Sequence, residues 1–250
     1  DVLPQTEIGR ILGIADKIDN IAATFSRGKA PTGSQDPFAL RRQALGIINI
    51  LLEGKMNLDL AKAVGAAILL LQVPMDKVKE LGKQILDFIK LRFRNLMLEQ
   101  KVRYDVIDAV LAETRNNDIY DLYLRARALN AYAGSERAAD VIQAATRVNN
   151  LSSKAETEVP VNESLFTEQA EKDLYAVVRK LDKEIIPLTV RCDYAGALDI
   201  LSGLNAPVNK FFDDVMVMDK DEAVKNNRLS LLCQVKDLFN CVGDLSKIVM

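Results

Sequence analysis

Apolar residues recur along most of this sequence at intervals of three and four, which is the spacing of an amphipathic α-helix. The alternation of apolar and polar residues that is typical of a β-strand is nowhere convincing. The pattern therefore predicts an all-α fold. The expected helices, in chain order, cover residues 5–26, 37–53, 57–71, 74–100, 105–113, 119–132, 135–149, 167–192, 194–202, 207–218 and 221–248.

The sharpest predicted helix boundary lies at Asp36-Pro37. Aspartate is a preferred N-cap residue, and proline fits the first helical position, where its missing N–H is not needed. We therefore expect a helix from residue 37 to about residue 53, with an apolar stripe on one side. The expected stripe consists of Phe38, Leu45, Ile48 and Leu52.

Arg41 falls on this apolar stripe, three residues after Phe38. A guanidinium that is removed from water needs a partner, because an unpaired buried charge is costly. Two interpretations stay open. Arg41 forms a structural ion pair with a carboxylate such as Asp16 or Asp19, or its planar fork contacts a phosphate.

The composition supports the helical interpretation and narrows the class of protein. Of the 250 residues, 49% are hydrophobic and 27% are charged, while only 12 are glycine and 7 are proline. The longest apolar runs, 47–52 and 66–71, are far shorter than the roughly 20 residues that span a bilayer, so we expect no membrane span. The chain begins with aspartate, without a leader pattern, and we expect a piece of a longer, cytoplasmic protein.

The sequence contains no histidine, which excludes several kinds of active site. Imidazole is the usual general base near neutral pH and the commonest metal ligand, so Ser-His-Asp and Cys-His catalysis and His-ligated metals are ruled out. The three cysteines, at 192, 233 and 241, lack C-x-x-C spacing and suit buried thiols in a reducing compartment. We expect no catalytic residue and no metal site.

A row of basic residues follows the long helix expected at 74–100. Residues 77–103 carry eight basic and three acidic side chains, although the net charge of the whole chain is only -2. Within this segment four cations are spaced by 7, 4 and 7 residues, which places them on one line of a helix. Such a row is either a solvated face or a surface for a phosphate backbone. Its members are Lys83, Lys90, Arg94 and Lys101.

The last expected helix carries an arginine where packing alone would favour leucine. Its apolar seam follows a 4-3-4-3 spacing, and Arg228 takes the second place in it. Asn226 and Asn227 precede it, and Lys210, Phe211 and Phe212 lie in the helix before. Amide, guanidinium and aromatic side chains on a helical platform suit the reading of single-stranded bases, although the helical spacing favours a place in the core for the two phenylalanines. The alternative is two exposed asparagines and an arginine paired with a carboxylate at 213 or 214.

Seven segments of the chain resemble the C-terminal region of bacterial glycyl-tRNA synthetase β subunits. The segments are ADKID (15–19), PTGSQDPFALRRQALGI (31–47), RYDVIDAVLA (103–112), TRVNNL (146–151), AEKDLY (170–175), PVNKFFDDVMVM (207–218) and NNRLSLL (226–232).

The resemblance implies two helical domains. Residues 1–100 would be the C-terminal part of an HD-like domain, and residues 101–250 would be a helical-bundle anticodon-binding domain of the arginyl-tRNA synthetase type. HD hydrolases hold their metal through His-Asp pairs, which this histidine-free chain cannot supply. Arg147 corresponds to a basic helix end in the family, where it would contact RNA or complement the helix dipole.

The resemblance also implies a function and partners. The chain would recognise tRNA-Gly, in its anticodon region, as part of a class II glycine-tRNA ligase with an α2β2 assembly. ATP and glycine would be bound by the α subunit, so that this chain itself needs no cofactor and is not catalytic. No DNA and no membrane are expected as partners. Two alternatives stay open, a non-catalytic helical protein-interaction scaffold and a remnant HD-type phosphohydrolase.

Overall fold

The computed structural model describes residues 2–33, 35–112, 116–155 and 159–250. Within these ranges the regular structure is helical, and a single bridge between Thr32 and Gln35 is the nearest approach to a strand. The predicted all-α fold is therefore confirmed. No helix in the described part of the chain combines the length and the apolar character that a membrane crossing requires.

The chain divides into two units. The first unit comprises residues 1–102 and 114–123, and the second comprises residues 103–113 and 124–250. The main boundary between the units therefore falls just after the long helix, and residues 114–123 belong again to the first unit. The identity of each unit as an HD-like or an anticodon-binding domain stays a prediction at this point.

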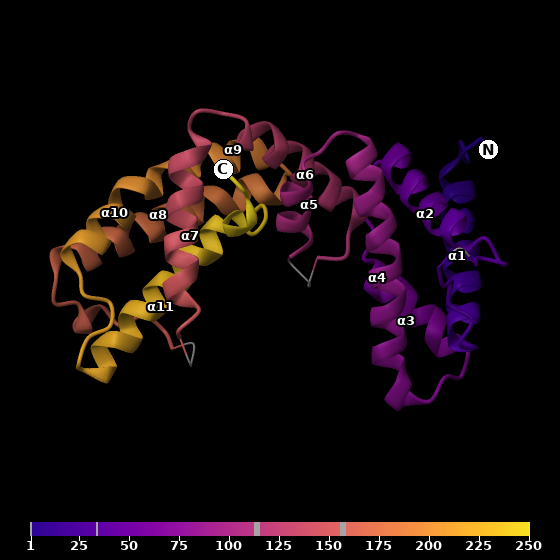
Figure 1. Ribbon diagram of the computed structural model, residues 1–250, viewed down its shortest axis with the longest axis horizontal. Coiled ribbons are helices and arrows are strands. Elements are labelled where there is room, and N and C mark those ends of the chain that lie inside the picture. The colour runs from indigo at the N-terminus through magenta and orange to yellow at the C-terminus, as the bar shows by residue number, and fades with distance from the viewer. Residues whose placement is uncertain (1, 34, 113–115, 156–158) are drawn as a thin grey trace. The chain divides into compact units, whose positions relative to one another are not determined.

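The first unit is built on four helices (Figure 1). They are α1 (Glu7–Ser26), α2 (Leu40–Gly54), α3 (Leu60–Leu70) and α4 (Met75–Glu99). Helix α1 packs against α2 and α3, and α4 covers both of these. The core side chains recur at helical spacing, as the sequence pattern requires. They include Ile21, Ile47, Ile48, Leu51, Val64, Ile68, Ile85 and Phe93.

The predicted start of the second helix is wrong by three residues. Helix α2 begins at Leu40, because the Asp36 carboxylate accepts hydrogen bonds from the backbone N–H groups of Leu40 (2.8 Å) and Arg41 (2.9 Å). Ala39, directly before the helix, takes a left-handed conformation with φ of 53°. Aspartate therefore caps this helix as predicted, but across an irregular turn instead of from the adjacent position.

This displacement also makes the predicted apolar stripe of α2 wrong at Phe38 and Leu45, whereas Ile48 is buried as predicted. Phe38 lies outside the helix and is 47% exposed, and Leu45 is 37% exposed. The buried face follows the 3-4 spacing from the true start of the helix. It consists of Leu40, Ala44, Ile47, Ile48 and Leu51.

Helix α3 begins at Leu60, three residues after its predicted start at residue 57. Asp59 caps this helix, two residues after the position at which the helix was predicted to begin, with its carboxylate accepting from the N–H groups of Ala61 and Lys62. The Asn57 side chain instead donates to the carboxylate of Asp118 at 3.0 Å.

The second unit is a bundle of shorter helices around α11 (Figure 1). Helix α11 packs against α7 and α8, α10 packs against α8 and α7, and α9 packs against α8. Large side chains such as Tyr194, Phe211 and Phe239 fill the centre. The helices are α5 (Tyr104–Leu111), α6 (Ile119–Ala133, whose first turn belongs to the first unit), α7 (Ala138–Ser152), α8 (Gln169–Val190), α9 (Tyr194–Leu201), α10 (Asn205–Asp214) and α11 (Glu222–Phe239), with 3-10 turns η1 (Glu163–Leu165), η2 (Ser202–Leu204) and η3 (Leu245–Lys247).

Two predicted helix ends in this unit need comment. Helix α11 ends at Phe239 and not near residue 248, because the chain turns there and passes close to α5. At Gly243 an added Cβ would lie 3.2 Å from the carbonyl oxygen of Ala109, so this approach favours glycine. The end that was expected for α5 at residue 113 lies outside the described residues.

Candidate nucleic-acid interface

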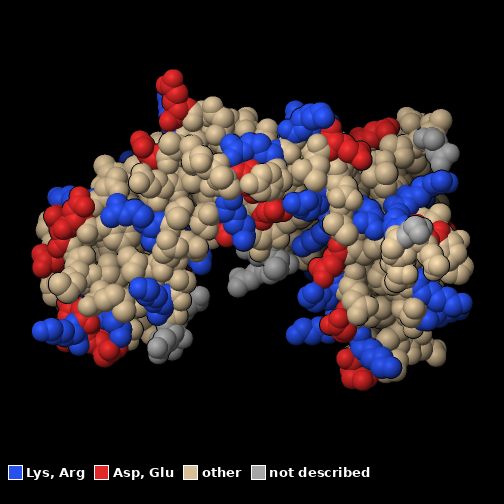
Figure 2. Space-filling model, viewed as in Figure 1, with Lys and Arg blue, Asp and Glu red and all other residues tan. Residues whose placement is uncertain are grey.

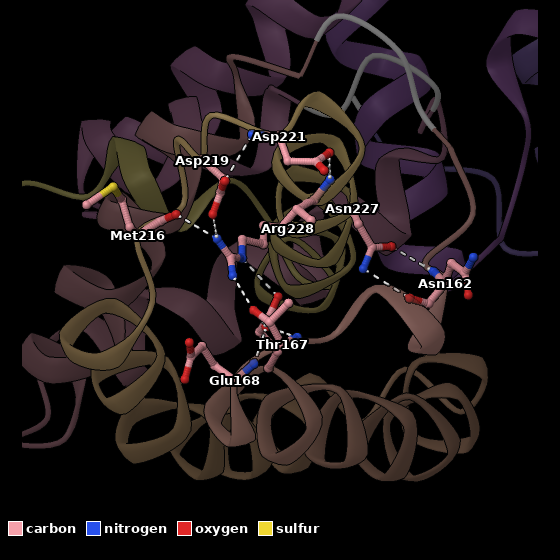
Figure 3. Close-up of polar contacts among 10 residues, drawn as sticks. Asn162, Thr167, Glu168, Met216, Asp219, Asp221, Asn227 and Arg228 are labelled. Atoms are coloured by element: carbon pink, nitrogen blue, oxygen red, sulfur yellow. Dashed lines mark hydrogen bonds and ion pairs between the residues drawn. The ribbon is translucent and has the colours of Figure 1, made fainter.

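Arg228 is the centre of a buried polar network in the second unit (Figure 3). Only 3% of the residue is exposed. Its Nε donates to Glu171 at 2.9 Å, and its Nη1 donates to Asp219 at 2.7 Å and to the carbonyl of Met216 at 2.9 Å. Its Nη2 donates to the hydroxyl of Thr167 at 2.8 Å. The guanidinium therefore joins α11, the start of α8 and the segment after α10.

Glu171 completes this network from the first turn of α8. It is fully buried, and its second oxygen accepts from the backbone N–H groups of Thr167 (2.9 Å) and Glu168 (2.8 Å). The buried carboxylate thus has both a cationic partner and helix N-terminal donors, as a buried charge requires. Burial by itself lowers the pKa of Arg228, but the hydrogen bonds and charges of Glu171 and Asp219 outweigh it, so that the pKa is raised.

This geometry corrects two expectations for Arg228. Its carboxylate partners are Glu171 and Asp219, not Asp213 or Asp214. The guanidinium also points into the bundle, so the conformation described offers no surface on which Arg228 could read a base. The residue connects three segments of the fold, and its seam position is explained by a partner 57 residues away.

The two asparagines before Arg228 have different surroundings. Asn227 is buried, and its side-chain amide forms two hydrogen bonds with the backbone of Asn162: Oδ1 accepts from the N–H at 2.7 Å and Nδ2 donates to the carbonyl at 3.1 Å (Figure 3). Asn227 therefore anchors the chain before α8. Asn226 is half-buried, and its amide makes no hydrogen bond with any residue that the structure describes.

Arg147 and Phe212 form an exposed platform on α7 and α10. The Arg147 guanidinium carbon lies 4.5 Å from the centroid of the Phe212 ring, and Nη1 donates to Oδ1 of Asn209 at 2.9 Å. Lys210, the next residue on α10, pairs loosely with Asp173 at 3.5 Å and is largely exposed. A guanidinium that lies over an aromatic ring can stack on a base with its other face. We call Arg147, Asn209, Lys210 and Phe212 the α7/α10 platform.

The sequence pointed to Arg147, Lys210 and Phe212 of this platform, but not to Asn209. Arg147 was expected at a helix end, but α7 continues to Ser152, so a dipole role does not explain it. Phe212 was expected in the core. Phe211 is fully buried, whereas Phe212 is half-buried and lies against Arg147. No spacing in the sequence could relate Arg147 to Phe212, because they meet only through the packing of α10 on α7.

The basic row on α4 belongs to the first unit, and its members differ in their contacts. Lys83 is exposed and pairs with Asp87 at 2.8 Å. Lys90 is half-buried and donates to the carbonyl of Asn116 at 2.9 Å. Arg94 is half-buried and also has an interaction partner. Lys101 is exposed beyond the end of α4, in a left-handed conformation with φ of 63°. Three of the four basic side chains in this row therefore already interact with other groups of the protein.

Arg41 is half-buried beside the loop before α2. Its Nη2 donates to the carbonyl of Gly33 at 2.5 Å. Among the described residues it makes no ion pair with Asp16 or Asp19. These two carboxylates line a different cavity, of about 500 Å³ and mainly apolar, between α1 and α3. No group of three or more histidine, cysteine or acidic residues within the described ranges is placed to hold a metal ion.

A second ion pair in the second unit, of which only the carboxylate is buried, had no counterpart in the sequence analysis. Arg103 Nη2 lies 2.6 Å from Oδ2 of Asp105, and Asp105 accepts from the N–H groups of Val106 (2.9 Å) and Val249 (2.8 Å). The pair therefore fastens the end of the chain to α5. The R-x-D spacing in RYDVIDAVLA was visible in the sequence, but its partner at Val249 was not.

Two family profiles match this chain, one over most of the first unit and one over most of the second unit. A profile of the family described as glycyl-tRNA synthetase beta subunit matches residues 1–112, and a profile of the DALR anticodon binding domain matches residues 141–248. The chain is 43% identical over 250 residues to the glycine–tRNA ligase beta subunit of Clostridioides difficile (strain 630). It is 39% identical over 248 residues to that of Natranaerobius thermophilus, and 40% identical over 250 residues to that of Colwellia psychrerythraea.

These alignments cover nearly all of this chain but only part of each relative. They include 100%, 98% and 98% of this chain, respectively. In each case the chain spans 36% of the relative's length.

Proposed function

Because the chain belongs to the glycyl-tRNA synthetase β subunit family, we propose that it is a tRNA-binding portion of a glycine-tRNA ligase. Its second unit recognises the anticodon region of tRNA-Gly during the ATP-dependent attachment of glycine to tRNA. The observation that carries this proposal is the match of the anticodon-binding profile to residues 141–248, which contain the α7/α10 platform.

The α7/α10 platform has the chemistry that single-stranded RNA requires. Unstacked bases bind to flat side chains by stacking and to amides by hydrogen bonds at their edges. Arg147 on Phe212 supplies the flat cationic face, Asn209 supplies the amide, and Lys210 supplies a cation for a neighbouring phosphate. The half-buried amide of Asn226 is a further candidate for a base edge.

The catalytic step belongs to another part of the enzyme in this proposal. The chain has no histidine to act as a general base, and its buried carboxylates Glu171 and Asp105 are bonded to arginines within the fold. ATP and glycine would be bound by the α subunit in an α2β2 assembly in the cytoplasm. The chain would supply affinity and specificity for tRNA, as a non-catalytic module does.

A salt titration of RNA binding tests the proposal. The anticodon stem-loop of tRNA-Gly should bind the chain, with an affinity that falls steeply as salt increases. Arg147→Gln with Lys210→Gln should weaken this binding and reduce the salt slope by up to about 1.4, two contacts' worth for a single strand. The matched control, Arg137→Gln with Lys180→Gln, removes two exposed, loosely paired cations of the same unit and should leave the slope nearly unchanged.

Other outcomes would support the other candidate functions. A parent chain that binds no tRNA but pairs tightly with another protein would indicate an interaction scaffold. Release of phosphate from a substrate, dependent on an added metal, would indicate a phosphohydrolase. A footprint of the chain on tRNA-Gly that leaves the anticodon loop unprotected would refute the anticodon assignment.

A further inference from the structure

A pocket between α2 and α4 in the first unit is lined by three arginines. Arg41 and Arg42 come from the first turn of α2, and Arg92 comes from the middle of α4. The pocket has a volume of about 620 Å³. We call it the arginine pocket. Its other lining residues are Gly33, Leu45, Asn95, Leu96 and Glu99.

The positive charge of the arginine pocket is not balanced within the fold. Glu99 is the one acidic residue in its described lining. The nearby carboxylate of Asp36 adds a second negative charge while it accepts the N–H groups of Leu40 and Arg41, so three guanidinium groups face two carboxylates. Arg42 is exposed and has no ion pair with a described residue.

Arg92 is the most unusual member of the pocket. Its guanidinium carbon lies 4.6 Å from the centroid of the Phe88 ring, and its Nε is buried without a hydrogen-bond partner among the described residues. Burial lowers the pKa of Arg92, and the charge of Arg41 lowers it further, while Asp36 opposes this. A buried donor without a partner is uncommon in native proteins, but an atom with no accessible surface cannot itself touch a molecule in the pocket, so Arg92 would act through its outer guanidinium nitrogens.

The excess of guanidinium groups over carboxylates around the pocket makes an anion the expected ligand. Like charges held close together destabilise a fold unless a counter-charge joins them, and guanidinium groups bind phosphate through paired N–H donors. The volume exceeds what a lone phosphate needs and falls in the range of small-ligand sites. Leu45, Leu96 and Asn95 would then contact the sugar or base attached to the phosphate.

We propose that the arginine pocket binds a backbone phosphate of the RNA that this chain recognises. Arg42 and Arg92 make the charged contacts, and Arg41 is held in place by its bond to Gly33. This inference rests on the proposed function, since it takes tRNA as the source of the phosphate. It adds a contact in the first unit, which the anticodon-binding profile does not cover.

The test compares a pocket variant with a charge-matched control in binding to full-length tRNA-Gly. The pocket variant is Arg42→Gln with Arg92→Gln. The control is Arg27→Gln with Lys62→Gln, which removes two exposed cations of the same unit from outside the pocket. The pocket variant should reduce the slope of log affinity against log salt by about 1.8, and the control should change it by much less. Arg42→Gln alone, at an exposed position, should reduce it by about 0.9 and guards against misfolding of the double variant.

The outcomes separate this inference from the proposed function. If the parent and both variants bind tRNA with one common slope, the pocket inference is overturned while tRNA binding stands. If the parent itself does not bind tRNA, both fail. A third outcome combines two measurements. In the first, inorganic phosphate at millimolar concentration shifts the NMR resonances of the pocket residues in the parent chain; in the second, the pocket variants keep the parent's salt slope of tRNA binding. This outcome would show that the pocket binds free phosphate and would refute the RNA contact.

Discussion

At the scale of single residues, the same side-chain type has different roles according to its partners. Arg228 is buried, and its donors are distributed over Glu171, Asp219, Met216 and Thr167, so it stabilises the fold. Arg92 is half-buried and lines a pocket together with two other arginines, so it is a candidate to contact an anion. What distinguishes the two arginines is whether the surrounding chain satisfies their donors, and this cannot be read from residue type.

Arg228→Leu should destabilise the chain by about 3–5 kcal/mol, because it leaves the carboxylate of Glu171 buried without its cation. Urea unfolding followed by circular dichroism would measure this. The matched control is Asn226→Ala, two positions earlier, which should change the free energy of unfolding by no more than about 0.5 kcal/mol. A loss below about 1 kcal/mol for Arg228→Leu would contradict the structural role, and altered discrimination between anticodon stem-loops by the folded variant would return Arg228 to the recognition surface.

Asp105 should make the stability of the chain depend on pH in the acid range. Burial by itself raises its pKa, but the hydrogen bond and charge of Arg103 and the N–H groups of Val249 and Val106 lower it more, so the folded-state pKa lies below the ordinary value of about 3.9. As pH falls, the unfolded chain therefore takes up this proton first. The stabilisation is fully present above about pH 5 and is lost as pH falls toward the folded-state pKa.

The measurement is the urea midpoint of the parent and of Asp105→Asn between pH 3 and pH 7. The parent should be the more stable protein at pH 7, and its advantage should shrink below about pH 5. An advantage that stays constant over this range would show that Asp105 does not titrate differently in the folded chain.

At the scale of elements, the caps determine where each helix begins. Asp36 closes the start of α2 across three non-helical residues, and Asp59 closes the start of α3. The cap of α2 also decides which side of the helix is buried, since it excludes Phe38 from the helix and places Arg41 and Arg42 in its first turn. The arginine pocket thus depends on this irregular start.

Asp36→Ala should therefore destabilise the first unit by about 1–2 kcal/mol, because two backbone N–H groups lose their acceptor. Asp36→Asn, which keeps one acceptor oxygen, should recover part of the loss. As a control, Asp76→Ala removes a carboxylate from the first turn of α4, where no side-chain cap is present, and should cost less than about 1 kcal/mol. Equal losses for the two alanine variants in chemical denaturation would show that the Asp36 cap does not matter.

At the scale of the whole molecule, the net charge of -2 means that RNA binding must come from local groups of cations. Lysine and arginine side chains are interspersed with acidic ones over the face shown in Figure 2. The two proposed RNA contacts lie in different units, the α7/α10 platform in the second and the arginine pocket in the first. They share no residue.

The effects of the two sites on tRNA binding should therefore add. A combined variant, Arg42→Gln and Arg92→Gln with Arg147→Gln, should reduce the salt slope by the sum of the separate reductions, about 2.5 in total. The measurement is a binding titration of tRNA to the single, double and combined variants at four or more salt concentrations. A combined effect equal to that of either site alone would mean that the RNA does not engage both sites in one complex.

The sequence by itself determined the helical class and most of the helices, because the 3-4 spacing of apolar residues depends only on the helix period. It also determined the family, which the matching profile and the relatives confirm. Local capping signals placed the helix ends less well, since Asp36 could cap from the adjacent position or across a turn and both choices satisfy its carboxylate.

Only the tertiary structure decided what the functional side chains do. Arg228 contacts Glu171, Arg147 contacts Phe212, and Arg92 lines one pocket with Arg41, across separations of 57, 65 and 51 residues, and no periodicity connects such positions. Whether a charge is neutralised inside the fold or left for a ligand depends on which helices pack together. That packing is settled by the burial of the whole apolar surface, and the polar side chains take the partners that it brings within reach.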